Sequence, residues 1–421
     1  MPITLFVTFI LLFIIAFIGN RVSKLPSNIW LLFLAQPLAL SSASMVVLAG
    51  GLLGAEIAPS PELATLPLTF MILMTAGGVV PAAMMMKKMG RRIGTMLGLL
   101  SAVIGGLVAA TAAVYANFVM LIIAAGLLGF SMAFVAQMRF AAIESLSDPK
   151  DSPKAISVLM IGSMFAAVLG PEVAAVGKDW IESPYGFAGS FAGLSLMIIV
   201  AIFFISRLAP IGVAEQAGSE VSRKLSEIIK QPIFIISVCS GAIAYGVMSY
   251  VMTASPLSMH QIDGHDLLAT KWVIQSHIIA MYLPSLFSAY LIAFFGIRKL
   301  MAMGTSLYFL VVLVALSGQQ VMHYWWAMVL LGIGWNFLFT SGTILLPESY
   351  QPNERFKVQA SNDFLIFFVQ AMASLSAGWI LFSQGWSLLI KVIVPILLLM
   401  FLVSSWFFRL RMKADKQAQS N

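Results

Sequence analysis

Long apolar segments separated by short polar loops run along almost the whole chain. Each is long enough to cross a membrane as a helix, because about 20 apolar residues span the hydrocarbon core of a bilayer. Twelve such segments lie near residues 28–52, 64–86, 94–115, 118–142, 155–177, 186–207, 232–254, 271–294, 298–317, 324–346, 357–381 and 385–408. A shorter apolar segment, residues 3–19, precedes them, and we expect it to form an extra N-terminal helix. The pattern therefore predicts an all-α membrane protein.

A polar stretch at residues 208–230 divides the twelve segments six and six. It contains Glu215, Glu220, Arg223, Lys224, Glu227 and Lys230, which is typical of a soluble central loop. We therefore expect five parts: an N-terminal helix and linker (1–27), a six-helix half (28–207), a central loop (208–230), a second six-helix half (231–410) and a tail (411–421).

The composition supports a membrane protein and excludes several other classes. The chain is 60% hydrophobic and 10% charged, whereas soluble proteins are about 25% charged. A net charge of +7 would be compatible with nucleic-acid binding. However, when the start of segment 28–52 is placed in the cytoplasm, 21 of the 24 lysines and arginines, including Lys150, fall on that side. This bias indicates a multi-pass protein of a bacterial inner membrane with a cytoplasmic C-terminus, and we expect no nucleic-acid partner.

Two similar stretches indicate an internal repeat. Gly90 follows the second long segment, Gly296 follows the eighth, and the two glycines lie 206 residues apart. Parallel repeats of six helices are one arrangement that transporters adopt. Lys88, Gly90, Arg91 and Arg92 match the loop motif G-x-x-x-D-R/K-x-G-R-R, although Ala83 and Lys87 replace its first glycine and its acid. The chain resembles the major facilitator superfamily, which implies two six-helix bundles with twelve core helices.

Four soft metal donors lie in two neighbouring segments. Met248 and Met252 belong to the seventh long segment, and His277 and Met281 to the eighth. Residues four apart on a helix differ by about 40° around its axis, so each pair presents two donors on one face. The two pairs are numbered symmetrically about the intervening loop, so an antiparallel hairpin would bring them together. Thioether and imidazole donors suit Cu(I), and we predict that these residues bind copper as a transported substrate.

A narrower resemblance supports the copper hypothesis. The chain is similar to CcoA-like copper importers in its MxxxM and HxxxM pairs, in the run from Met252 to Met259, and in the block from Gly334 to Asp363. The resemblance implies that copper enters the cytoplasm for haem-copper oxidase assembly, with a cytoplasmic copper acceptor as a partner. A sister group resembles riboflavin importers, and this is the main alternative.

Other residues are candidates for copper capture, coupling or gating. Met259 and His265 lie in the outer loop between the metal-binding segments and are candidates for capture of copper, although ordinary loop residues explain them equally well. Glu172 follows a Gly-Pro pair inside an apolar segment, where a buried acid requires a partner or water. It is a candidate for proton coupling.

Charges at the cytoplasmic end are candidates for gating. We expect Asp363, near Arg355 and Lys357, and the motif residues Arg91 and Arg92 to act there. The repeat offset also relates His277 to Met71 and brings Met252 near Met45. These two methionines could line the opposite wall of the cavity, although we favour their interpretation as packing residues.

Alternative functions remain on the same scaffold. Tyr245, Trp272, Tyr282 and Trp335 could stack on the flat ring of riboflavin or another small molecule. The stretch from Ala166 to Ala175 resembles the glycine-proline motif of drug/proton antiporters, but the acid of the loop motif is missing. The sequence has no ATP-binding motif and no catalytic constellation, so we expect a secondary transporter without a resident cofactor and not an enzyme.

Overall fold

The computed structural model describes residues 3–148, 151–211 and 223–420, and within these ranges all regular structure is helical. The first half contains α1 (Ile3–Val22), α2 (Ser27–Met45), η1 (Val46–Gly50), α3 (Gly51–Ile57), η2 (Pro61–Leu63), α4 (Leu66–Val114), α5 (Phe118–Ala136), α6 (Met138–Glu144), α7 (Ser152–Val176) and α8 (Ala188–Ser206). Lys150, Glu215 and Glu220 of the sequence predictions lie outside the described residues.

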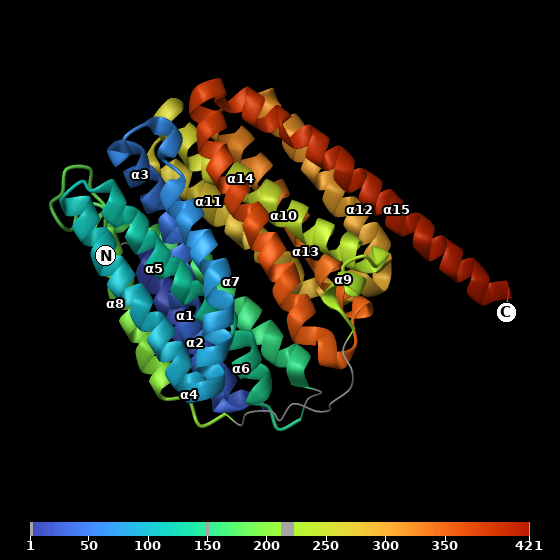
Figure 1. Ribbon diagram of the computed structural model, residues 1–421. Coiled ribbons are helices and arrows are strands. Elements are labelled where there is room, and N and C mark those ends of the chain that lie inside the picture. The colour runs from blue at the N-terminus through green and yellow to red at the C-terminus, as the bar shows by residue number, and fades with distance from the viewer. Residues whose placement is uncertain (1–2, 149–150, 212–222, 421) are drawn as a thin grey trace.

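The second half repeats this pattern. It contains α9 (Leu225–Ile228), α10 (Pro232–Leu257), η4 (Ser258–Ile262), α11 (Leu267–Tyr282), η5 (Leu283–Phe287), α12 (Ser288–Ser317), α13 (Val321–Leu345), η6 (Leu346–Ser349), η7 (Pro352–Glu354), α14 (Arg355–Lys391) and α15 (Ile393–Ser420). Figure 1 shows the halves as two bundles, with α15 running beyond the second one. The predicted tail from residue 411 continues this helix as far as Ser420.

All the predicted membrane spans except the eighth lie in helices that are long and apolar enough to cross a membrane. Eleven stretches of the described chain are long and apolar enough to cross a membrane, and the last, Lys357–Leu410, includes both the eleventh and the twelfth predicted segments. The eighth segment is divided among α11, η5 and the start of α12. Helix α1 is one of the eleven stretches, so the extra N-terminal helix is long enough to span. The all-α, multi-pass fold is confirmed.

The two glycines of the predicted repeat break their helices in the same way. Gly90 in α4 has φ 82° and ψ 160°, and Gly296 in α12 has φ 72° and ψ 158°. This region of backbone conformation is almost closed to residues with a Cβ atom. Each glycine therefore ends one span and turns the chain into the next. The near-identical angles, 206 residues apart in sequence, agree with a structural repeat.

Helix α1 lies on the outside of the first bundle. Its buried residues are Leu5, Thr8, Leu12 and Ala16, which form a single stripe at helical spacing. This stripe packs against α2 and α7. The remaining surface of α1 is apolar and exposed, including Phe6, Phe13 and Phe17. Such a surface is suited to lipid, because a helix in a bilayer needs only its packed face to be specific.

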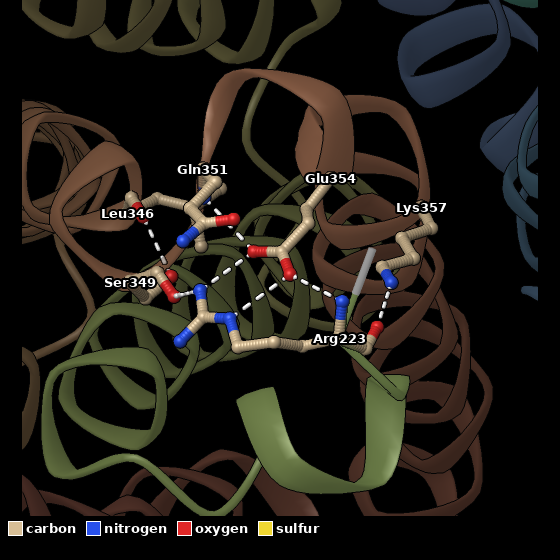
Figure 2. Close-up of polar contacts among 6 residues, drawn as sticks. All are labelled: Arg223, Leu346, Ser349, Gln351, Glu354 and Lys357. Atoms are coloured by element: carbon tan, nitrogen blue, oxygen red, sulfur yellow. Dashed lines mark hydrogen bonds and ion pairs between the residues drawn. The ribbon is translucent and has the colours of Figure 1, made fainter. Parts of the chain in front are cut away.

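The described end of the central loop is attached to the second half near α14. The Glu354 carboxylate accepts hydrogen bonds from the Arg223 side chain at 2.6 and 2.9 Å and from the backbone N–H groups of Arg223 and Gln351. Lys357 donates to the Arg223 carbonyl oxygen, and Arg223 also donates to Ser349 (Figure 2). The hydrogen bonds from Arg223 lower the pKa of Glu354 from 4.5 to about 2. We call this cluster the linker latch.

The halves contact each other at the end opposite the central loop. We call that the far end, and the end with the central loop the linker end. At the far end Lys271 Nζ of α11 lies 2.9 Å from Glu172 Oε1 of α7. Gln261 donates to Glu56 at 3.0 Å, and Gln275 donates to the carbonyl oxygen of Val168 at 3.4 Å. These three contacts all join the first half to the second.

Candidate substrate cavity

A cavity of about 270 Å³ lies between the halves. The first half contributes residues of α2, η1, α4, α5 and α7, and the second half residues of α10, α11 and α14. The lining residues are Leu40, Ala43, Ser44, Val47, Leu68, Met71, Ile72, Thr75, Met132, Ala136, Ser163, Ala166, Tyr245, Met248, Ser249, Met252, Thr253, Ile278, Met281, Tyr282, Phe367 and Gln370. The position between two six-helix repeats is where secondary transporters bind their substrates.

The cavity wall is apolar with a few neutral polar groups. Among the lining residues, all of which the structure describes, no side chain is charged. The nearest charges along the lining helices stand toward the linker end. Arg139 follows the lining residue Ala136, and Asp363 precedes the lining residue Phe367 by one helical turn. The arrangement favours a neutral substrate, because burying an uncompensated charge is costly.

Three of the four predicted copper-binding residues line the cavity. Met248, Met252 and Met281 all contribute to its wall, from α10 and α11. Met71 of the first half also lines it, which agrees with the alternative that this methionine belongs to the opposite wall. Met45, in contrast, is completely buried in the core. The methionines form a soft, polarizable surface, which suits either a metal or a large aromatic ligand.

His277 is directed elsewhere. It is fully buried and is absent from the cavity lining. Its Nδ1 donates to the carbonyl oxygen of Met328 on α13 at 2.7 Å. The structure therefore does not bring the imidazole and the three thioethers together in the cavity. In the described part of the chain there is also no cluster of three or more His, Cys, Asp or Glu side chains able to hold a metal.

The predicted capture residues are both engaged in the structure. Met259 is completely buried within η4, and its carbonyl oxygen accepts a hydrogen bond from the N–H of His265 at 2.8 Å. The ring of His265 contacts the Gln319 carbonyl oxygen through Nε2 at 2.8 Å. The two residues thus stabilise the loop between α10 and α11. Their predicted role in metal capture stays a prediction.

The candidate coupling residue lies at the far end of the molecule, and the candidate gating residues lie at the linker end. Glu172 is 3% exposed and pairs with Lys271 across the halves at the far end. At the linker end Arg91 forms a two-pronged pair with Glu144 of the same half, at 2.6 and 2.9 Å, while Arg92 is exposed. Asp363 accepts a hydrogen bond from Asn362 at 3.0 Å. Lys271 and Glu172 are 99 residues apart, so no local sequence pattern indicates that they pair.

The candidate aromatic residues divide into two groups. Tyr245 and Tyr282 line the cavity together with Phe367. Trp335 supports them from behind, with its ring centroid 5.2 Å from Tyr245 and 6.2 Å from Tyr282. Trp272 instead stacks on Trp325 at 5.4 Å and does not line the cavity. The second half therefore provides one aromatic wall.

Comparisons with known proteins agree with this architecture. The sequence profile of the Major Facilitator Superfamily matches residues 29–270. The chain is 36% identical over 378 residues to the riboflavin transporter RfnT of Brucella anthropi, covering 88% of this chain and 93% of that protein. It is 30% identical over 356 residues to the uncharacterized MFS-type transporter YdeG of Bacillus subtilis, covering 81% and 82% of the two chains.

A further similarity is to the uncharacterized MFS-type transporter YddS of Bacillus subtilis, at 28% identity over 381 residues and 86% of each chain. The matches extend over both six-helix halves, as do the repeated glycine breaks. The chain therefore belongs to the Major Facilitator Superfamily and is a multi-pass membrane transporter of that family.

Proposed function

We propose that the protein is a secondary transporter that imports riboflavin, or a closely related flavin, across a bacterial inner membrane. The observation that carries the proposal is the 36% identity to a riboflavin transporter over 88% of the chain. The cavity chemistry supports it. Riboflavin has a flat ring system and a hydroxylated chain without net charge, and the cavity has an aromatic wall, neutral polar groups and no charged lining side chain.

Copper import is the second candidate, because Met248, Met252 and Met281 line the cavity. It has less support than flavin import. His277 would complete the predicted donor set, but its ring is hydrogen-bonded to α13 and lies outside the lining. None of the relatives described above carries a name that refers to copper. A cytoplasmic copper acceptor would be a partner only in this case.

Two uptake assays distinguish the candidates. Radiolabelled riboflavin and radiolabelled copper are supplied to cells without their own riboflavin uptake that express wild type, Tyr245→Ala or Met252→Ala. Flavin import predicts saturable riboflavin uptake by wild type, at least about tenfold lower uptake with Tyr245→Ala because the aromatic wall is removed, and no protein-dependent copper uptake. Copper uptake by wild type that is lost in Met252→Ala, with no riboflavin uptake, would overturn the proposal.

A further inference from the structure

The polar groups of the cavity differ between the two halves in what they already bind. On the first half, Thr75 Oγ1 contacts the carbonyl oxygens of Met71 at 2.9 Å and Gly129 at 3.0 Å. The hydroxyls of Ser44 and Ser163 are likewise within hydrogen-bond distance of backbone carbonyl oxygens. A hydroxyl that already donates its single proton inside the protein cannot donate to a substrate and can only accept a hydrogen bond from it.

The second half carries polar groups that are still available. Tyr245 and Ser249 on α10, Tyr282 on α11 and Gln370 on α14 all line the cavity. Their side chains form no hydrogen bond with any described residue, and their polar atoms are not completely enclosed by protein. These groups are therefore accessible from the cavity. They provide three hydroxyls and one amide, all neutral.

The four groups belong to neighbouring helices. Tyr245 and Ser249 are separated by one turn of α10, so they face the same way. Helix α10 packs against both α11 and α14, which bring Tyr282 and Gln370 beside it. The opposite wall consists of aliphatic side chains, Met71, Met132 and hydroxyls that are already bonded.

We propose that the halves divide substrate recognition. The second half hydrogen-bonds the hydroxylated part of the substrate through Tyr245, Ser249, Tyr282 and Gln370. The first half contributes a mainly apolar contact surface and donates no hydrogen bond to the substrate. This inference rests on the proposed function, since it takes the polyhydroxylated chain of a flavin as the group that is bound. Preference for a flavin with that chain is then determined by the second half.

A competition assay tests this division. Uptake of radiolabelled riboflavin is inhibited with unlabelled riboflavin and with a flavin in which a methyl group replaces the ribityl chain. We define the ratio as the half-inhibitory concentration of the methyl flavin divided by that of riboflavin. This ratio measures recognition of the ribityl chain and does not depend on the amount of transporter. Ser249→Ala, Tyr282→Phe and Gln370→Leu each remove polar atoms while keeping most of the side-chain volume. Each is expected to reduce the ratio about 3- to 10-fold, as for loss of one hydrogen bond.

Thr75→Val is the matched control from the opposite wall. Its hydroxyl proton is engaged by backbone oxygens and cannot be donated to the substrate, so the ratio is expected to equal that of wild type even if total uptake changes. A wild-type ratio in all three second-half variants would overturn the inference, and so would an equal reduction in Thr75→Val. If wild type takes up no riboflavin at all, the proposed function fails and this inference fails with it. Riboflavin uptake with unchanged ratios overturns the inference alone.

Discussion

At the scale of the residue, His277 is oriented by one hydrogen bond, from Nδ1 to the Met328 carbonyl oxygen at 2.7 Å. Because Nδ1 donates, Nε2 of the neutral ring carries the lone pair. That atom is buried and has no partner among the described residues. The cavity face of α11 consists of Ile278, Met281 and Tyr282. His277 lies about 100° around the helix from Ile278, which directs it toward α13 instead.

We predict that His277→Ala weakens the packing of α11 on α13 and affects uptake only through the amount of folded protein. The substitution removes a fully buried side chain and its hydrogen bond to the Met328 carbonyl oxygen, and loss of the hydrogen bond alone costs about 0.5–1.5 kcal/mol. The melting temperature of the purified protein should fall. Uptake per folded molecule should stay within about twofold of wild type. Abolished uptake at an unchanged melting temperature would instead indicate a direct role in transport.

Helical spacing in the sequence predicted some of the cavity residues correctly and others not. The spacing of Met248 and Met252 placed both on one face of a helix, and both line the cavity. The same rule applied to His277 and Met281 was insufficient, because a 40° difference is enough to move one side chain from the cavity to a neighbouring helix. The available hydroxyls of Ser249 and Tyr282 carry no sequence signal that distinguishes them from the bonded hydroxyl of Thr75.

At the scale of the element, the spans end at conformations that only glycine adopts readily. Gly90, Gly296 and Gly385 each have φ between 72° and 82°. A Cβ atom added at any of these glycines would meet no heavy atom within 4 Å. The requirement for glycine is therefore a property of the backbone and not of packing. It fixes the point at which one helix ends and the next begins.

Backbone strain at Gly90 can be tested separately from side-chain packing with a matched pair of substitutions in α4. Gly90→Ala is expected to destabilise the protein by about 1–3 kcal/mol through backbone strain. Gly77→Ala has equally open space around the added Cβ but lies within regular helix. It should be neutral or stabilising by up to about 1 kcal/mol. Thermal unfolding in detergent measures both. Equal effects of the two substitutions would show that strain at Gly90 is not the cause.

The order and number of elements were predictable because apolar length is a strong signal in a membrane protein. The boundary between the eleventh and twelfth predicted segments lies where Gly385 breaks α14. The π-helical turns η1 and η4 were not predicted. Their i→i+5 hydrogen bonds do not interrupt the run of apolar residues, so apolar length does not reveal them.

The linker latch provides a prediction about pH. The pKa of Glu354 is lowered to about 2, so its stabilising effect is complete above its ordinary value of 4.5 and is lost only as the pH falls toward 2. Glu354→Gln should therefore lower the melting temperature by a similar amount at pH 6, 7 and 8. A difference from wild type that shrinks between pH 8 and pH 6 would contradict a carboxylate held ionised by Arg223.

At the scale of the whole molecule, the two halves are joined at one end across the cavity. Glu172 and Lys271 are 3% and 14% exposed, and they connect α7 of the first half with α11 of the second. Alternating access requires the halves to separate at the far end so that the cavity opens there. Separation must break this ion pair. If one partner is removed while the far end stays closed, the other charge is left buried alone, which is strongly unfavourable. The pair therefore stabilises the conformation that is closed at the far end.

We predict that removing one charge shifts the molecule toward the conformation open at the far end, and that exchanging the charges reverses the shift. The reporter is Met252→Cys in a Cys239→Ser background, which leaves one cysteine in the cavity wall. Glu172→Gln should raise its labelling by an impermeant maleimide added to intact cells, by about tenfold for a shift of about 1.4 kcal/mol. Glu172→Lys combined with Lys271→Glu should return labelling toward the starting rate.

The control for this shift is Glu144→Gln. It breaks the pair with Arg91 at the linker end, within the first half, and should not raise labelling from the far end. Faster labelling could result from loss of the ion pair or from a damaged fold. The exchanged pair distinguishes these explanations, because Glu172→Lys with Lys271→Glu restores an ion pair but would not repair a damaged fold. If Glu172→Gln and the exchanged pair label equally fast, the ion pair does not control opening. The far end would then be held by Gln261, Gln275 and the packing of α7 on α11 and of α14 on η2 and α4.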